Sequence, residues 1–453
     1  MKNNQALQSL ICGLKDGGLD FVTNFPGGQS YFVFNELGGS QISMNERVAF
    51  ECAVGGSLAG RRSVVTLKGA GLNACADVFL HSVLSGVNAG LVVVLFDDIE
   101  AQSSPERQDS RPYIDVFGGL WLEPTSIGEA YGFGRDAFRW SEDLDVPVVI
   151  RITNQLLQLV GEFDRLPILK NKMLLMHNRD KYISHWKRRN DNLKVKNVKI
   201  KEFIEDYYKD YNFSFGSEVG IIKVGNCQRE VEKYRGTHAD ELVVSTYPLP
   251  EKLIYNFAKG RKKLIVLEQG VNYAETKIRS LLNNKQEFVG DTGDECDNSK
   301  EWPVFVEWEK MFLALESISP DFVVGDEGTF TDESTKTIEF CLSMGASVGV
   351  ALGLSMAGVR YPFAVVGDAS FAFSGKQTLD EVIHRKKNIG IIILDNGGAK
   401  SVGGMPIIGD IYDVGKMAKK VLNYNQTSLE QFQNLFKAMK EGNKSSILYV
   451  QKK

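Results

Sequence analysis

The sequence predicts an α/β protein built from parallel sheets, and two observations lead to that class. Short apolar runs such as 63–67 and 390–394 have the length of a buried strand, and segments with a helical pattern separate them. Continuous apolar strands that alternate with helices are typical of parallel sheets covered by helices on both faces. A chain of 453 residues also has room for roughly three domains.

Three α/β units are expected along the chain, at 1–160, at 161–300 (a linker and a smaller middle domain) and at 301–453. In chain order, the first unit is expected to contain a helix at 8–15, a strand at 21–23, a Pro26-Gly27-Gly28 turn, a helix at 47–59, a strand at 63–67, a helix at 77–84 and strands at 89–97 and 146–152. The charged stretch 161–215 predicts a linker and a helix with a solvated face. Strands at 221–224 and 263–268 mark the middle domain, which ends at a polar, turn-rich stretch.

The composition is that of an ordinary soluble globular protein and disfavours several kinds of partner. Hydrophobic residues make up 43% of the chain, charged residues 24%, and the net charge is −4. No basic field therefore favours nucleic acid or a membrane surface. No apolar stretch approaches the ~20 residues of a membrane helix, and no secretory signal is expected. The six cysteines are far apart, which disfavours zinc and iron–sulfur sites and predicts a cytoplasmic protein with reduced cysteines.

Two short polar segments in the third unit predict a metal site. Asp368 follows a strand expected at 363–366, and Asn396 closes the strand at 390–394, with a helix expected at 376–387 between them. A right-handed crossover makes these strands parallel, so both side chains should emerge at the edge where α/β sheets bind ligands. Mg²⁺ prefers such oxygen ligands together with a ligand's phosphates, and the Gly398 carbonyl is a third candidate. The alternative is a pair of ordinary turns.

A Gly-Asp-small motif followed by a strand that ends in Asn resembles the signature of thiamine diphosphate enzymes. Further segments, in one collinear order over nearly the whole chain, resemble the α subunit of indolepyruvate:ferredoxin oxidoreductases. They are 42–60 around Asn45-Glu46-Arg47, Ser103-Ser104 with 108–111, Leu122-Glu123-Pro124, 247–252 and Met344-Gly345-Ala346-Ser347. The resemblance implies the thiamine diphosphate-binding fold, with a pyrimidine-binding (PYR) domain at 1–160 and a diphosphate-binding (PP) domain at 301–453. It also implies a homodimer, because the cofactor often lies between domains of different subunits.

The resemblance assigns the activation of the cofactor to Glu46 and Met344. Glu46 matches a carboxylate that hydrogen-bonds a ring nitrogen of the aminopyrimidine and promotes loss of the thiazolium proton. From the residues alone, Ser43-Met44-Asn45-Glu46 also fits a capping box, in which Glu46 only caps a helix. Met344 matches a bulky apolar residue beneath the bent cofactor, although a methionine is ordinarily part of a core.

The resemblance also implies two sets of binding residues. The cofactor would be held, besides Glu46 and the metal candidates Asp368, Asn396 and Gly398, by Pro26, Gly27, Gly345, Ala346, Ser347, Gly367, Ala369 and Ser370. The glycines near Ser347 would let a helix N-terminus approach the diphosphate, and the Pro26-Gly27 turn has a generic turn as its alternative. The substrate cleft would be lined by Lys68, Asn73, Ser103, Ser104 and Arg111. The Arg111 guanidinium suits a substrate carboxylate, with an interface ion pair as the alternative.

Three departures from the family bear on the reaction. The sequence lacks the closely spaced cysteines of the family's C-terminal iron–sulfur domain, has Gly69, Gln102 and Gly404 where relatives tend to carry histidines, and is glycine-rich at 397–404. We therefore expect non-oxidative chemistry on a 2-oxo acid, in which decarboxylation through a ylid adduct gives an enamine that is protonated or joined to an acceptor. The alternatives are an oxidoreductase α subunit with a separate electron-transfer, iron–sulfur subunit, and a degenerate cofactor-binding scaffold.

Overall fold

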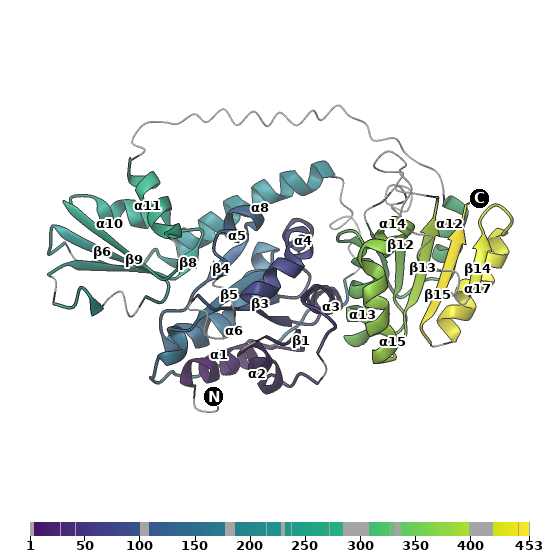
Figure 1. Cartoon of the computed structure of the whole chain (residues 1–453), viewed down its shortest axis with the longest axis horizontal. Coiled ribbons are helices and arrows are strands. Elements are labelled where there is room, and N and C mark those ends of the chain that lie inside the picture. Colours follow the sequence, from purple (N-terminus) through teal and green to yellow (C-terminus); the bar gives the residue numbers. More distant parts are fainter. Residues whose placement is uncertain are drawn as a thin grey trace.

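The computed structural model is an α/β structure whose strands form three sheets within the described residues (Figure 1). The described residues are 4–27, 29–40, 42–99, 108–176, 186–213, 215–227, 232–236, 238–270, 272–283, 308–326, 328, 330, 337–397, 420–442 and 444–452. Figure 1 shows the first domain between the middle domain and the C-terminal domain. None of the described helices combines the length and apolar character that a membrane crossing requires.

The first sheet has the strand order β1-β2-β3-β5-β4-β8, and only β8 runs antiparallel to its neighbour. Its strands are β1 (Phe21–Asn24), β2 (Ser63–Lys68), β3 (Leu91–Asp97), β4 (Leu120–Leu122), β5 (Val148–Thr153) and β8 (Thr246–Tyr247). The helices of this domain are α1 (Gln5–Asp16), α2 (Gln29–Glu36), α3 (Glu46–Leu58), α4 (Gly69–Ser85), α5 (Tyr113–Phe117) and α6 (Ile127–Leu144). The expected parallel strands are confirmed, with ends that shift by one or two residues.

Several features of the first domain were not predicted from the sequence, among them β4, α6 and the first turns of α4. The strand β4 is only three residues long and so gives little pattern. The helix α6 carries several glycines, which weaken a helical pattern. Two glycines, Gly13 of α1 and Gly134 of α6, let these helices cross closely. The space is too small for a side chain, since a Cβ on Gly13 would lie 2.2 Å from the Tyr131 carbonyl oxygen. The helix α4 begins at Gly69 rather than near 77, and the two glycines of its first turn weaken the helical pattern there.

The segment after β5 returns across the first domain before the chain enters the middle domain. The Leu169 amide donates to the Asp16 carbonyl at 2.7 Å, and the Met176 amide donates to the Leu58 carbonyl at 2.9 Å. Residues 161–176 therefore pack on the first domain. The helix α8 (Trp186–Tyr207) follows and packs against α4 and α6. The middle sheet has the order β7-β6-β9 and contains β6 (Val219–Val224), β7 (Asp240–Val244) and β9 (Lys263–Glu268), with helices α10 (Glu251–Ala258) and α11 (Tyr273–Asn283).

The C-terminal sheet is parallel throughout, in the order β11-β10-β12-β13-β15-β14. Its strands are β10 (Val323–Gly325), β11 (Phe340–Cys341), β12 (Phe363–Gly367), β13 (Gly390–Asp395), β14 (Lys420–Asn423) and β15 (Ser446–Gln451). Its helices are α12 (Glu309–Ser317), α13 (Ser347–Met356), α14 (Asp368–Ser370), the π-helical turn η2 (Phe371–Gly375), α15 (Lys376–Arg385) and α17 (Leu429–Glu441). The helix predicted at 376–387 and the strands on either side of it are confirmed.

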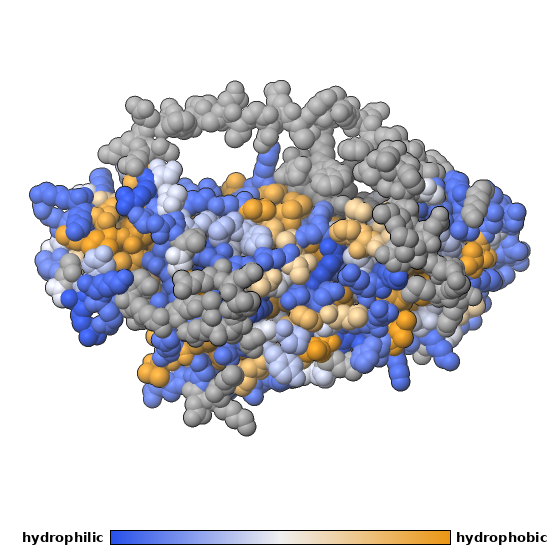
Figure 2. Space-filling view, viewed as in Figure 1, coloured by the Kyte–Doolittle hydropathy of each residue, from blue (hydrophilic) through white to orange (hydrophobic). Residues whose placement is uncertain are grey.

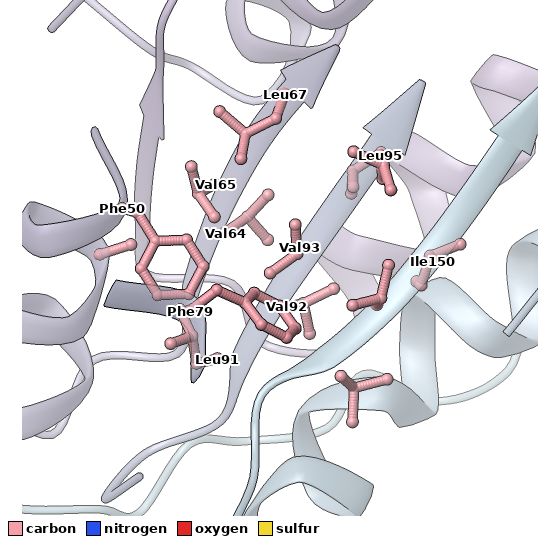
Figure 3. Close-up of a cluster of buried hydrophobic side chains, with 14 of the residues drawn as sticks. Phe50, Val64, Val65, Leu67, Phe79, Leu91, Val92, Val93, Leu95 and Ile150 are labelled. Atoms are coloured by element: carbon pink, nitrogen blue, oxygen red, sulfur yellow. The ribbon is translucent and has the colours of Figure 1, made fainter. Parts of the chain in front are cut away.

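Apolar side chains of the central strands form the core of the first domain (Figure 3). The rings of Phe50 on α3 and Phe79 on α4 lie 5.6 Å apart between centroids and cover the apolar side chains of β2 and β3. Outside, hydrophilic side chains cover most of the face seen in Figure 2, and apolar patches interrupt them. This surface agrees with the ordinary composition of the sequence.

A helix pair joins the first domain to the C-terminal domain. The helices α3 and α13 pack side by side (Figure 1). Glycines allow the close approach: a Cβ on Gly55 would lie 2.2 Å from the Val350 carbonyl oxygen, and one on Gly353 would lie 2.2 Å from the Cys52 carbonyl oxygen. We call this contact between α3 and α13 the seam. Because both helices begin at candidate site residues, the seam decides where those residues meet.

Candidate functional site

The two predicted metal ligands lie at one edge of the C-terminal sheet. The strands β12 and β13 are adjacent and parallel, with Gly367 opposite Leu394. Asp368 therefore follows β12 beside Asp395, and Asn396 is the next residue after β13. Gly367, Asp368 and Ala369 are half-buried and Ser370 is buried. The structure thus brings the predicted carboxylate and amide together, whereas Gly398 lies outside the described residues.

Asp395 is a neighbouring carboxylate that the sequence analysis did not select. Its side chain is in hydrogen-bonding contact with that of Asp368 and accepts from Tyr449 Oη, the Gly397 amide and Gln451 Nε2. Burial alone would raise the pKa of Asp395, but these hydrogen bonds lower it below its usual range. The sequence signal was the position of Asp395 directly before Asn396. If β12 and β13 are adjacent and parallel, this position lies opposite Asp368.

This set of oxygen atoms fits a hard cation bound with a diphosphate. Carboxylate and amide oxygens are ligands that Mg²⁺ accepts, and it usually keeps phosphate or water oxygens as well. Within the described ranges, no three His, Cys, Asp or Glu side chains are grouped for metal binding. A cation at Asp368 and Asn396 would therefore depend on further oxygen ligands, such as those of a bound diphosphate.

The turn before α13 is built on Asp326, which directly follows β10. Asp326 is fully buried, and its carboxylate accepts from the Gly345 and Ser347 amides, both at 2.8 Å. Burial raises the pKa of Asp326 to about 7. Asp326 was not predicted from the sequence, although Gly325-Asp326 repeats the pattern of Gly367-Asp368 at a strand end.

Two contacts at this turn bear on the expected approach of the helix N-terminus to the diphosphate. The Gly345 and Ser347 amides donate to Asp326. A Cβ on Gly349 would lie 2.0 Å from Glu51 Oε2, so this glycine makes room in the seam. Ala346 and Ser347 are fully buried.

Gly345 places the turn directly on the segment that carries Asp368. Its φ is +75°, in the left-handed region that favours glycine. A Cβ here would lie 2.0 Å from Ser374 Oγ and 2.6 Å from the Ser370 carbonyl oxygen. Ser374 Oγ also donates to the Met344 carbonyl at 3.1 Å, and the Met344 side chain is 40% exposed. Met344 is therefore held at its backbone, and its side chain is not part of the core.

Glu46 is the first residue of α3, and the capping-box interpretation is wrong. The N-cap is Asn45, whose side chain accepts from the Val48 amide at 2.8 Å, and Ser43 plays no such part. The half-buried Glu46 side chain lies against Gly71 of α4, where a Cβ would come within 2.6 Å of Glu46 Cγ. Among the described residues, no group donates a hydrogen bond to the Glu46 carboxylate. The carboxylate is therefore available to a ligand.

The neighbouring Arg47 connects the start of α3 to the Met344 turn. Arg47 Nη2 donates to the Met344 carbonyl at 2.9 Å and to Ser343 Oγ at 3.1 Å. Its Nε donates to Glu51 at 2.9 Å, and its Nη1 donates to Asp77 at 3.0 Å. Within one chain, Glu46 of the first domain thus lies one residue from a direct contact with the turn of the C-terminal domain.

The predicted turn and two substrate candidates lie at the carboxyl ends of β1 and β2. Gly27 packs on Lys68, whose Cβ would be 2.9 Å from a Cβ on the glycine. Asn73 on α4 accepts from Tyr113 Oη and exchanges hydrogen bonds with Gln108 at 2.9 and 3.1 Å. Pro26 precedes Gly27 in the same turn. Ser103 and Ser104 lie outside the described residues.

Arg111 lies in a buried charged cluster between the first and middle domains. It is 1% exposed, and its donors reach Asp109, Glu268 Oε2 at 2.5 Å and the Gln269 carbonyl oxygen at 2.6 Å. Glu268 is the last residue of β9 in the middle domain, and Gln269 follows it. These contacts favour the interface ion pair over the binding of a substrate carboxylate.

Comparison with known proteins connects these features to one group of enzymes. Residues 327–444 match the model of the thiamine pyrophosphate enzyme C-terminal TPP-binding domain. The chain is 25% identical to the indolepyruvate oxidoreductase subunit IorA of Methanothermobacter thermautotrophicus, over 86% of this chain and 74% of the relative. It is also 25% identical to the IorA subunit of Archaeoglobus fulgidus, over 88% of this chain and 75% of the relative.

Solved structures of thiamine diphosphate enzymes share the fold. One is the 4-hydroxybenzoylformate decarboxylase of Rhodococcus jostii RHA1, with a TM-score of 0.54, 15% identity and 99% coverage of both chains. Another is the benzoylformate decarboxylase of Polynucleobacter necessarius, with a TM-score of 0.53, 13% identity and coverage of 99% of this chain and 98% of that one. Residues 327–444 therefore correspond to a thiamine pyrophosphate-binding domain, the chain shares the fold of thiamine diphosphate-dependent enzymes, and over most of its length it is similar to the indolepyruvate oxidoreductase subunit IorA.

Proposed function

We propose that the chain binds thiamine diphosphate with Mg²⁺ and decarboxylates a 2-oxo acid. The observation that carries the proposal is the contact of Arg47 with the Met344 carbonyl. This contact brings the start of α3, with its available Glu46 carboxylate, to the turn that packs on the Asp368 segment. A carboxylate for the aminopyrimidine and oxygen ligands for a diphosphate-bound cation are the two requirements of the cofactor. Both converge on one region of the chain.

Each residue has a defined part in this proposal. Asp368 and Asn396 would hold the cation beside the Asp395 carboxylate, and the Gly398 carbonyl is the third ligand in the proposal. Glu46 would bind a ring nitrogen of the aminopyrimidine and hold a proton there. Met344 would support the cofactor from its exposed position, and Pro26 and Gly27, which packs on Lys68, would contact it. When bound, thiamine diphosphate supplies the nucleophilic carbon and the electron sink for decarboxylation.

We further propose that the product leaves by a non-oxidative route, as an aldehyde or joined to an acceptor. None of the six cysteines is spaced from another like an iron–sulfur ligand pair. The sequence therefore offers no cysteine set that would pass electrons from the site. The relationship to IorA favours a second candidate, in which electrons pass to a separate iron–sulfur subunit.

Release of CO₂ from a panel of aryl and alkyl 2-oxo acids tests the proposal. With thiamine diphosphate and Mg²⁺, the purified chain should release CO₂ without an electron acceptor. Turnover only with viologen and coenzyme A would instead support the oxidative candidate, and no release in either assay would contradict both.

Site variants connect the activity to the proposed residues. Glu46→Gln should lower turnover by a factor of roughly 10²–10⁴, the usual range for a lost acid–base group. Asp368→Ala should abolish Mg²⁺-dependent binding of the cofactor, measured by calorimetry. Glu430→Gln, at an exposed position on α17, is the control for the loss of one carboxylate. A fully active Asp368→Ala variant would contradict the assignment of the metal site.

A further inference from the structure

The last strand of the chain reaches the edge of the C-terminal sheet where the predicted metal ligands lie. The strands β13 and β15 are adjacent and parallel, with Asp395 opposite Gln451 (Figure 1). Because side chains alternate along a strand, Tyr449 and Gln451 lie on the same face of β15. Tyr449 Oη donates to Asp395 Oδ2, and Gln451 Nε2 donates to the same oxygen at 3.2 Å. The strand β15 therefore holds the carboxylate that directly precedes Asn396.

The other oxygen of Asp395 holds the backbone after β13. The Gly397 amide donates to Asp395 Oδ1 at 2.8 Å. Gly397 has a φ of +85°, in the left-handed region that favours glycine. Asn396 lies between the two residues that this hydrogen bond joins. The bond therefore fixes the backbone from which the Asn396 side chain extends.

The contacts of Asp395 suit a residue that holds its neighbours better than one that binds the cation itself. A carboxylate has about four lone-pair positions. Tyr449, Gln451 and Gly397 donate to three of them, and the remaining contact is with Asp368. Among the described residues, no lysine or arginine pairs with Asp395. Its negative charge therefore lies beside Asp368 without a cationic side chain of its own, which favours a cation at this edge.

We propose that Asp395 is a positioning residue for the cation site, held by Tyr449 and Gln451 of β15 so that Asn396 and Asp368 can share one cation. The proposal rests on the proposed function for the identity of the cation and of the diphosphate. Asp395 acts through Asn396 and Asp368 and is not itself a ligand. The last strand of the sheet thus sets the affinity for the cation, although it supplies no ligand.

Calorimetric titration of Mg²⁺ tests this role without using activity. Mg²⁺ is added to the purified chain in the presence of a fixed excess of thiamine diphosphate, and the heat of a titration without protein is subtracted. In Tyr449→Phe, which loses only the hydroxyl group, the Kd for Mg²⁺ should rise by a factor of roughly 10, the low end of the range for a lost partner of metal ligands. An unchanged Kd would overturn the proposal.

A second buried tyrosine in the same domain provides the matched control. Tyr361 Oη donates to the Lys444 carbonyl oxygen at 3.0 Å, at the amino ends of β12 and β15 and so at the opposite edge of the sheet. Tyr361→Phe also removes one hydroxyl hydrogen bond, but it should leave the Kd for Mg²⁺ unchanged. A rise as large as that of Tyr449→Phe would show that Tyr449 acts only through the general stability of the domain.

Two variants of Asp395 separate its hydrogen bond to Gly397 from its charge. Asp395→Asn keeps an oxygen that can accept from the Gly397 amide, whereas Asp395→Ala keeps none. Both lose the charge, so the Asn variant should bind Mg²⁺ more tightly than the Ala variant by about fivefold, the effect of one ordinary hydrogen bond. Equal affinities would overturn the positioning role. If Asp395→Ala does not fold, the comparison of Tyr449→Phe with Tyr361→Phe decides.

Hydrogen exchange of the chain without cofactor tests the arrangement itself. In Asp395→Asn and Tyr449→Phe, exchange of the amides in 395–397 should become faster, and Tyr361→Phe should leave it unchanged. Wild-type exchange in both site variants would overturn the proposal. The titrations also distinguish two kinds of failure. If the wild-type chain binds no Mg²⁺ with thiamine diphosphate, the proposed function fails and the positioning role fails with it. If the wild type binds Mg²⁺ and Tyr449→Phe binds it equally well, only the positioning role fails.

Discussion

At the scale of single residues, two carboxyl groups are buried close to the seam between α3 and α13. Glu51 of α3 and Asp326 after β10 are both fully buried, and burial raises the pKa of Glu51 to about 8 and that of Asp326 to about 7. The positive charge of Arg47 lowers the pKa of both carboxyl groups, but the effect of burial is larger. Glu51 therefore keeps its proton at neutral pH, and the loss of this proton should weaken the seam.

The pH dependence of stability should report on Glu51. The ordinary pKa of this side chain is 4.5, so between pH 4.5 and 8 the unfolded chain is ionised there while the folded chain keeps the proton. The folded state thus binds more protons, and its stability must fall as the pH rises through this window. Glu51→Gln should remove this contribution, which has a slope of at most about 1.4 kcal/mol per pH unit.

Urea denaturation of both proteins at several pH values between 5 and 8 measures the difference. The exposed variant Glu430→Gln corrects for the loss of one acidic group. If the free energies of unfolding of the wild type and of Glu51→Gln changed with pH in parallel across this range, Glu51 would not titrate with a raised pKa in the folded protein.

At the scale of elements, the position of the site depends on the close crossing of α3 and α13. A Cβ on Gly353 would lie 2.2, 2.6 and 2.7 Å from the O, Cα and C atoms of Cys52, and backbone atoms cannot rotate away. Gly353→Ala should therefore lower the free energy of unfolding by about 1–3 kcal/mol, as overpacking commonly does. It should also speed amide exchange at both helices.

A glycine with free space around it is the matched control for this substitution. A Cβ on Gly132 of α6 would meet nothing within 4 Å. Gly132→Ala should raise the free energy of unfolding by about 0.5–1 kcal/mol, because alanine is the better helix former. If both alanine variants were stabilised equally, the tight crossing of α3 and α13 would be disproved.

The elements also show which parts of the site the sequence could predict. Asp368 and Asn396 were accessible because each follows a strand whose pattern is local, and one helix separates the strands. Glu46 depended on a resemblance, since its local pattern equally suited a helix cap. The contacts of Arg47 and Asp326 were not accessible, because their partners are not local in the chain and no local pattern encodes such pairs. The sequence could not decide between the two interpretations of Arg111 for the same reason, as its partner Glu268 belongs to another domain.

At the scale of the whole molecule, a buried charged cluster joins the first domain to the middle domain. Arg151 binds Asp97 and Glu123 at 2.6 Å and Asp109 at 3.2 Å, and Arg111 binds Asp109 and Glu268. Burial would raise the pKa of Asp109, but the guanidinium groups of Arg151 and Arg111 lower it to about 2. Asp109 therefore stays charged at neutral pH, and the two guanidinium groups stabilise its charge in place of water.

Removal of Arg111 should separate these two domains rather than impair substrate binding alone. In Arg111→Met, the carboxylates of Asp109 and Glu268 lose a buried counter-charge, which typically costs about 3–5 kcal/mol. We expect a large loss in the free energy of unfolding and faster proteolysis between the first and middle domains. Arg279, which is 72% exposed and pairs with Glu275 on α11, provides the control. Arg279→Met should change the stability by less than about 1 kcal/mol. An Arg111→Met protein of normal stability with a raised KM would instead restore Arg111 as the group that binds the substrate carboxylate.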